Sequence, residues 1–272
     1  MTLSSRARAT AATAALLAVL PAGAAQAETM VGIDANDRVV TFDSATPGSA
    51  KARAVRGLAA GETIVGLDRR PATGALVAVS SASRLYTLSP RTGQVTPIGM
   101  AAFTPALSGS AVGFDFNPTV DRIRLTTSNG QNLRLNPDTG AVAATDGPLK
   151  YNAGDQGEGT PAFVGGSAYT NNVAGATTTQ LFNLDSRRDA LLLQMPPNDG
   201  GLKTIGSLGR AFTNPIGFDI SGTSNTAYAS LRSPGARFST FGRIDLATGR
   251  FTATGRVGSR AVPRLLKALT VR

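Results

Sequence analysis

The sequence predicts an all-β protein, a β-propeller of five four-stranded antiparallel blades, because one unit recurs along the chain. Each unit begins with a four-residue motif: a hydrophobic residue, Gly, a second hydrophobic residue and Asp. Three copies of this motif end at Asp68, Asp115 and Asp219. A second motif consists of a short hydrophobic strand followed by a turn that closes on Gly. It recurs at intervals of about 50 residues, a length typical of the repeats of propellers. Its turns close on Gly93, Gly140, Gly200 and Gly249.

Alternating side chains indicate that these units are built from strands. In residues 122–125 and 133–135, hydrophobic residues alternate with Arg, which is the period of a strand with one buried and one solvated face. No segment between the motifs has the pattern of a long helix. A six-bladed propeller or a β-sandwich is the alternative.

The blades are expected to follow one another along residues 28–272, which form a single domain. The first blade covers residues 30–55 and lacks one strand. The other four begin near Ile64, Val112, Phe163 and Ile216. Residues 266–271 can supply the missing strand, so that both ends of the chain close the ring in one sheet and leave no open edge.

Residues 1–27 have the order of a secretory signal peptide. Arg6 and Arg8 precede an uncharged apolar run over residues 9–20, and Ala25-Gln26-Ala27 fits a signal peptidase site. The run is too short to cross a bilayer. We therefore expect Sec-type export, cleavage after Ala27, and a periplasmic or extracellular protein that does not span the membrane after cleavage. An uncleaved anchor is the alternative.

The composition excludes many enzyme mechanisms, because the chain contains no His and no Cys. It therefore cannot form a Ser-His-Asp triad, a Cys nucleophile, or a zinc site with His or thiolate ligands. No catalytic motif is present. The sequence favours a protein that is not an enzyme and has no cofactor, apart from a possible hard cation.

The candidate metal ligands are Asp68, Asp115 and Asp219. If equivalent positions of the blades meet at the ring axis, these carboxylates form a cluster that can bind a hard cation such as Ca²⁺. The alternative is structural, because an Asp before a turn often accepts a hydrogen bond from its own backbone. A polar insertion at residues 149–160 is either a solvated linker or a second source of oxygen ligands.

Positive charge is concentrated near the C-terminus. Residues 210–272 contain ten basic and two acidic residues. Arg binds phosphate and carboxylate groups well, so an anionic polymer or a lipid surface is a candidate partner. The candidate contacts are Arg237, Arg243, Arg250, Arg256, Arg260 and Arg264. Coding bias, or charge that protects edge strands, explains the excess equally well. Aromatic stacking groups are few, so sequence-specific binding of nucleic acid is not expected.

Several long motifs resemble a bacterial family of exported propeller-like proteins that is classed as a domain of unknown function. They span residues 42–48, 61–68, 103–109, 113–124, 131–146, 174–179 and 196–200. The resemblance covers nearly all of residues 28–272 and implies export and a propeller fold, without catalytic residues to carry over. The Arg-rich sequence of residues 232–264 differs most from the pattern expected for this family.

Three functional hypotheses follow. The first is a non-catalytic binding scaffold in the cell envelope or outside the cell, with a partner that the sequence does not identify. The second is a metal-assisted hydrolase that uses the axial carboxylates. The third is electrostatic adhesion to a polyanion through the Arg-rich last blade.

Overall fold

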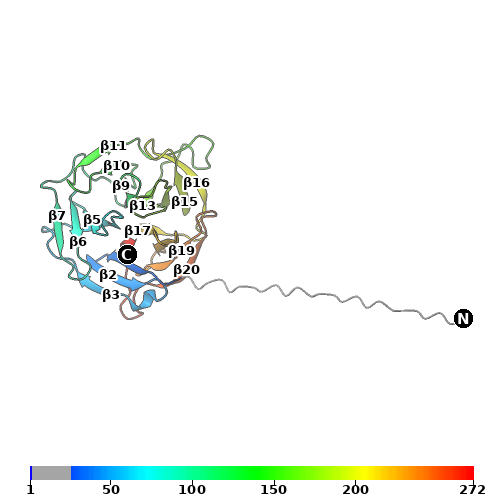
Figure 1. The fold of residues 1–272 in the computed structure, drawn as a ribbon, viewed down its shortest axis with the longest axis horizontal. Coiled ribbons are helices and arrows are strands. Elements are labelled where there is room, and N and C mark those ends of the chain that lie inside the picture. The colour runs from blue at the N-terminus through cyan, green and yellow to red at the C-terminus, as the bar shows by residue number, and fades with distance from the viewer. Residues whose placement is uncertain (2–25) are drawn as a thin grey trace.

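The computed structural model describes Met1 and residues 26–272. The predicted signal peptide, residues 1–27, lies mostly within residues 2–25, outside the described residues. The described chain forms five β-sheets arranged as the blades of a ring (Figure 1). None of the described helices is long and apolar enough to cross a membrane.

Each blade contains four antiparallel strands in order from the axis outward, and blade 4 has one further strand at its outer edge. Blade 1 contains β21 (Leu266–Val271), β1 (Thr29–Asp34), β2 (Arg38–Asp43) and β3 (Lys51–Ala54). Blade 2 contains β4 (Ile64–Arg69), β5 (Leu76–Ser80), β6 (Leu85–Leu88) and β7 (Val95–Ile98). Blade 3 contains β8 (Val112–Asn117), β9 (Arg122–Thr127), β10 (Asn132–Leu135) and β11 (Val142–Thr145).

The remaining blades follow the same order. Blade 4 contains β13 (Val164–Tyr169), β14 (Leu181–Asp185), β15 (Ala190–Gln194) and β16 (Gly201–Ser207). Blade 5 contains β17 (Thr213–Ile220), β18 (Ala227–Arg232), β19 (Thr240–Ile244) and β20 (Phe251–Arg256). A short 3₁₀ helix, Pro47–Ser49, connects β2 to β3. The predicted five-bladed propeller is therefore confirmed.

The two ends of the chain close the ring, as predicted. Strand β21 pairs antiparallel with β1, with Val271 opposite Met30 and Ala268 opposite Ile33. The C-terminal strand is the innermost strand of blade 1, and the C-terminus lies at the centre of the ring (Figure 1). The inner strands β21, β4, β8, β13 and β17 contact one another around the axis.

Blade 4 departs from the predicted four strands. Strand β12 (Lys150–Tyr151), from the polar insertion, pairs parallel with β16 and forms a fifth, outermost strand. Two residues of pairing have no hydrophobic period of their own, so the pattern of the sequence did not reveal this strand.

Hydrophobic side chains pack between neighbouring blades, and the described residues show one exception. Separate apolar clusters join blades 1 and 2, blades 2 and 3, blades 4 and 5, and blades 5 and 1. Between blades 3 and 4, buried polar groups make the contact. The hydroxyls of Thr126 and Ser167 are 2.7 Å apart, and Arg124 hydrogen bonds to Tyr169 and Asn198.

Arg124 corrects one detail of the sequence analysis. Its alternation with Ile123 and Leu125 placed it on a solvated face, but its side chain is only 1% exposed and forms a salt bridge to Asp146. A neighbouring blade covers the face that would be solvated in an isolated sheet. Since a buried guanidinium must be paired, Asp146 and polar side chains surround it.

Removing residues 266–272 is expected to abolish cooperative folding. The deletion takes away the innermost strand of blade 1, including the buried Leu266 and Leu269, and exposes β1 as an edge. Loss of two buried Leu side chains costs about 2 to 5 kcal/mol each, a large part of the stability of a typical domain. Thermal unfolding followed by circular dichroism, with size-exclusion chromatography for aggregation, measures the effect. Removal of Arg272 alone is the control; a native-like transition for both deletions would contradict ring closure by β21.

Candidate functional site

The repeated Gly-x-Asp motif lies at the axis, where neighbouring inner strands come close together. A Cβ atom on Gly66 would lie 2.7 Å from Cβ of Phe114, and one on Gly217 would lie 2.5 Å from Cβ of Leu269. Both distances are too short for a real side chain, so Gly allows the inner strand of the next blade to approach. The Asp two residues later reaches that same neighbouring strand.

Each of the three Asp side chains binds the backbone of the next blade. Oδ2 of Asp68 accepts a hydrogen bond from the N–H of Phe116 at 2.8 Å. Asp115 accepts one from Tyr169 at 2.8 Å, and Asp219 accepts one from Val271 at 2.6 Å. The expected Asx turn is therefore not the main role of these residues, although Oδ1 of Asp219 also accepts from the N–H of Ile220.

Ala168 and Thr270 occupy the corresponding positions of the two remaining inner strands. Thr270 Oγ1 lies 2.8 Å from Asp68 Oδ1 and 3.0 Å from Asp219 Oδ2. Ala168 offers no polar group. The ring of five positions thus contains three carboxylates, one hydroxyl and one methyl group.

The three carboxylates converge, as the candidate metal site requires. One oxygen from each of Asp68, Asp115 and Asp219 lies within 4.8 Å of the other two, and all three residues are 1% exposed. Oδ1 of Asp115 is buried and has no hydrogen-bond partner in the described part of the chain. Two ligands of a single Ca²⁺ can be up to twice the Ca²⁺–oxygen distance of about 2.4 Å apart, so these separations are in the range that candidate ligands of one cation require.

Burial and mutual repulsion change the acidity of the cluster. Burial raises the pKa of Asp68 to about 6, against the hydrogen bonds it accepts. Burial, followed by the charges of Asp68 and Asp219, raises the pKa of Asp115 well above its usual value. The pKa of Asp219 is raised in the same direction by burial and by the charge of Asp68. The cluster can therefore hold protons or a cation, but three bare carboxylates are unfavourable there.

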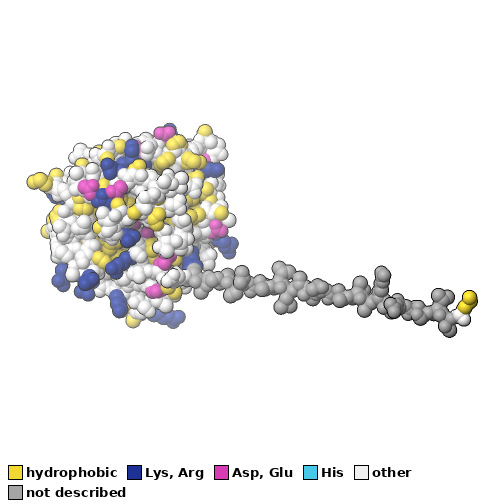
Figure 2. All heavy atoms as spheres, in the orientation of Figure 1, with side chains coloured by type: hydrophobic (Ala, Val, Ile, Leu, Met, Phe, Trp, Pro, Cys, Tyr) yellow, Lys and Arg dark blue, Asp and Glu magenta, His cyan; other side chains and the backbone are white. Residues whose placement is uncertain are grey.

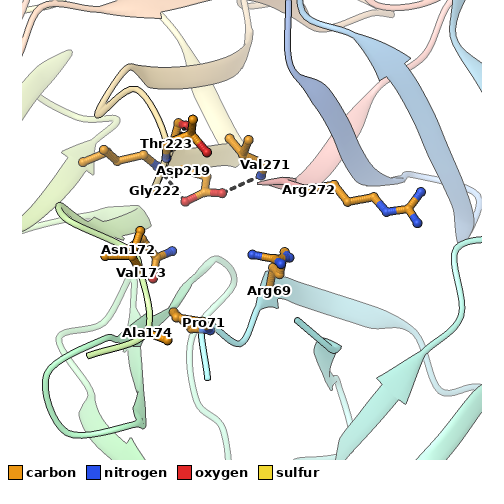
Figure 3. Close-up of a pocket in the computed structure, with 12 residues that line it drawn as sticks. Arg69, Pro71, Asn172, Val173, Ala174, Asp219, Gly222, Thr223, Val271 and Arg272 are labelled. Atoms are coloured by element: carbon orange, nitrogen blue, oxygen red, sulfur yellow. Dashed lines mark hydrogen bonds between the residues drawn. The ribbon is translucent and has the colours of Figure 1, made fainter. Parts of the chain in front are cut away.

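Two pockets lie at opposite ends of the axis. Where the inner strands end, a pocket of about 160 Å³ is lined by Asp219, Val271, Arg69 and Asn172, among others (Figure 3). Where the inner strands begin, a more apolar pocket of about 260 Å³ includes Lys267, whose ammonium group pairs with Asp37 at 2.8 Å. Of the three clustered carboxylates, only that of Asp219 lines the first pocket, so this pocket is the approach to the cluster.

The six candidate polyanion contacts differ in their exposure. The sequence predicted Arg264 as a contact for a partner. Its residue is 9% exposed and pairs with Asp34 of blade 1, so it is not available to one. Arg256 is half-buried over the ring of Phe238, 3.9 Å from its centroid. The other four, all exposed, are Arg237, Arg243, Arg250 and Arg260.

The positive charge is also not confined to the last blade. Arg264, Lys267 and Arg272 lie on or beside β21, which belongs to blade 1. Figure 2 shows Lys and Arg side chains in the lower half of the view, over the blades that contain β2, β3 and β20. The chain order of the charges therefore overstated their concentration in space.

The polar groups of the insertion hold it to blade 4. Tyr151 donates a hydrogen bond to Asp185 at 2.7 Å. Asp155 accepts from the N–H of Thr204, and Glu158 accepts from the N–H of Gly154. The insertion is thus neither a solvated linker nor a set of oxygen ligands that face one point.

In the presence of a chelator, the free energy of unfolding is expected to fall as the pH rises from 5 to 8. An unfolded Asp releases its proton near pH 4, whereas folded Asp68 retains its proton until about pH 6 and the other two for longer. The folded state therefore binds more protons than the unfolded state in this range, and Asp68 alone accounts for roughly 1.4 kcal/mol between pH 5 and pH 8. Urea unfolding at both pH values measures the change, and Asp115→Asn should flatten it. A stability that rises over this range would contradict the repulsion between the three carboxylates.

The comparisons with solved structures show the fold. A chain of the nidogen/laminin complex is 15% identical, with a TM-score of 0.50, and the match covers 89% of this chain and 97% of that one. A protein of unknown function from Bacteroides thetaiotaomicron is 14% identical, with a TM-score of 0.48 and coverages of 85% and 58%. The Dos1 propeller is 11% identical, with a TM-score of 0.42 and coverages of 79% and 53%.

The sequence comparisons give a family without a known activity. The search of curated proteins found no match. A family model described as a domain of unknown function, DUF4394, matches residues 38–266. This match covers most of the chain, including all of blades 2 to 5 and strands β2 and β3 of blade 1, in agreement with the resemblance found in its motifs. The chain therefore belongs to the DUF4394 family.

Proposed function

We propose that this chain is an exported, non-catalytic binding scaffold that holds a divalent cation at the axis of its propeller, with Ca²⁺ as the best fit. The observation that carries the proposal is the buried Oδ1 of Asp115, which faces two other carboxylates and has no hydrogen-bond partner in the described residues. A buried carboxylate oxygen normally has a partner, because leaving its hydrogen bond unmade is costly. A cation supplies that partner and offsets the repulsion in the same place.

The donor atoms suit a hard cation. All three side chains offer carboxylate oxygens, which Ca²⁺ prefers. Their Oδ2 atoms accept hydrogen bonds from the next blade, and these bonds fix the orientation of each carboxylate before a cation binds. The 160 Å³ pocket beside Asp219 provides an entry route and space for water ligands.

The same geometry favours a structural cation over a catalytic one. A catalytic metal site keeps a coordination position open to the substrate. Here the three ligands are 1% exposed, and they connect the inner strands of blades 2, 3 and 5 to the blades beside them. The convergence that a metal-assisted hydrolase requires is present, but the burial of all three carboxylates at the blade junctions favours the structural role.

The start of the folded chain supports export with cleavage after Ala27. Glu28 already belongs to the propeller: its N–H donates to Ser44 Oγ at 2.9 Å, and its carboxylate accepts from Tyr228 Oη at 2.7 Å. Strand β1 begins at the next residue, Thr29. Cleavage at the predicted site would leave every one of these contacts in place. The partner would then be a component of the envelope or of the extracellular medium.

Ca²⁺ is expected to raise the unfolding temperature of the chelated protein. At a concentration a hundredfold above its Kd, a ligand that binds only the folded state adds about 2.7 kcal/mol, or about 5 to 10 °C for a domain of this size. Asp115→Asn should lose the shift, while its amide oxygen still accepts from Tyr169. Differential scanning calorimetry of residues 28–272 with Ca²⁺, Mg²⁺ or chelator makes the measurement.

The control is Asp245→Asn, which makes the same change at an exposed turn of blade 5. It should leave the Ca²⁺ shift unchanged. A shift of equal size in the Asp115 variant, or none in the native chain, would overturn the cation site. A shift with Mg²⁺ alone would replace Ca²⁺ by the smaller ion.

Export predicts a defined mature protein. When the full chain is expressed in a bacterium, the product outside the cytoplasm should begin at Glu28, because the small residues Ala25 and Ala27 form the cleavage site. Intact mass and N-terminal sequencing of the exported fraction test this. Ala27→Leu should block processing, and a product that retains residues 1–27 in the wild type would contradict it.

A further inference from the structure

The pocket next to Asp219 contains a guanidinium group without a protein partner. Arg69 is half-buried at the end of β4, and its side chain forms no hydrogen bond or ion pair within the described residues. Figure 3 shows it at the pocket, below the carboxylate of Asp219. A partly desolvated guanidinium gains stability from an anion, so a missing partner points to a ligand.

Arg69 also departs from the pattern of the other blades. It directly follows the axial position of blade 2, held by Asp68. The residues that directly follow the axial positions of the other four inner strands carry apolar or aromatic side chains, and they are Phe116, Tyr169, Ile220 and Val271. Packing of an inner strand therefore does not require a charge at this position.

The next residue, Arg70, is an Arg with a structural role in this blade. Arg70 binds the carboxylates of Asp121 and Asp138 of blade 3, the second at 2.6 Å, and connects the two blades. Arg69 has no such carboxylate among the described residues. The two adjacent arginines thus have different environments, one paired between blades and one open to the pocket.

The pocket has space and a second donor beside Arg69. A Cβ atom at Gly74 would lie 3.1 Å from Nη2 of Arg69, so the absence of a side chain there makes room for the guanidinium group. Asn172, from the loop after β13 of blade 4, faces Arg69 across the pocket (Figure 3). Its Oδ1 is buried and has no hydrogen-bond partner in the described chain. The amide nitrogen of Asn172 points into the pocket in Figure 3 and can donate to a ligand there.

We propose that this pocket binds a small carboxylate anion, held by the guanidinium group of Arg69 and the side-chain amide of Asn172. The fork of an Arg matches two carboxylate oxygens, and an amide N–H adds a third donor. The volume of about 160 Å³ limits the ligand to a small molecule or to the acidic end of a larger one.

The neighbouring charges favour a carboxylate over a phosphate. Asp219 lines the inner wall, and a dianion is repelled by it more strongly than a monoanion. The guanidinium group of Arg272 points away from the pocket in Figure 3, which leaves a single directed guanidinium. This site goes beyond the axial cation, and its ligand does not contact Asp68 or Asp115.

Titration of residues 28–272 with sodium acetate, with sodium chloride at matched ionic strength as the reference, tests the proposal. The ¹⁵N-labelled Nε–H of Arg69 should shift on addition of acetate, and its signal is assigned by its loss in Arg69→Gln. Arg69→Gln should weaken acetate binding at least tenfold. Asn172→Asp keeps the shape of the side chain but places a carboxylate opposite the anion, and should weaken binding to a similar degree.

Arg250→Gln is the matched control, because it removes an exposed Arg from a turn of blade 5 and should leave binding unchanged. Circular dichroism shows that each variant is folded. A titration in chelator and one in Ca²⁺ separate this site from the axial one, since the Arg69 signal should respond to acetate in both. Equal effects of acetate and chloride, tighter binding of inorganic phosphate, or full binding by Arg69→Gln would each overturn the proposal.

Discussion

The ring depends on the hydrogen bond that an inner-strand Asp accepts from a backbone N–H of the next blade. The inner strands lie so close together that Gly is required at the contact, and their buried N–H groups need partners that their own sheets do not supply. Asp68, Asp115 and Asp219 supply these partners across three of the five junctions. Strand β21 completes the ring by donating the N–H of Val271 to Asp219.

The use of three Asp side chains for these hydrogen bonds concentrates negative charge at the axis of the ring. The three carboxylates that accept from these backbone donors lie with one oxygen of each within 4.8 Å of the other two. Burial raises all three pKa values, and the charges of neighbouring carboxylates add to this for Asp115 and Asp219. A proton or a cation must offset that charge. The same residues therefore connect the blades and form the proposed cation site, so a cation bound there would couple stability to binding.

The two ends of the axis differ in charge and polarity. The end where the inner strands begin is largely apolar, and its Lys267 is paired with Asp37. The other end combines the carboxylate of Asp219 with the open guanidinium group of Arg69. Blades 3 and 4 meet through buried polar groups around Arg124, whereas apolar clusters join the other neighbouring blades. The five blades thus repeat one backbone arrangement, but their side chains differ from blade to blade.

The sequence by itself determined the number of blades and the closing role of residues 266–271, because a repeated motif places equivalent residues at equivalent points of a ring. It left a cation cluster and local turn bonds as alternatives for the three Asp residues, and the structure showed that they meet. Only the tertiary structure decided whether a particular charged side chain is buried, paired or exposed. Arg124 and Arg264 carry the pattern of solvated residues, yet neighbouring blades bury them against Asp146 and Asp34. Arg69 and Arg70 are adjacent and chemically identical, but only Arg70 meets the carboxylates of Asp121 and Asp138 from the next blade. Hydrophobic periodicity reports which face of a strand is apolar, but contacts between residues far apart in the chain decide whether a charge meets a partner, water or a ligand.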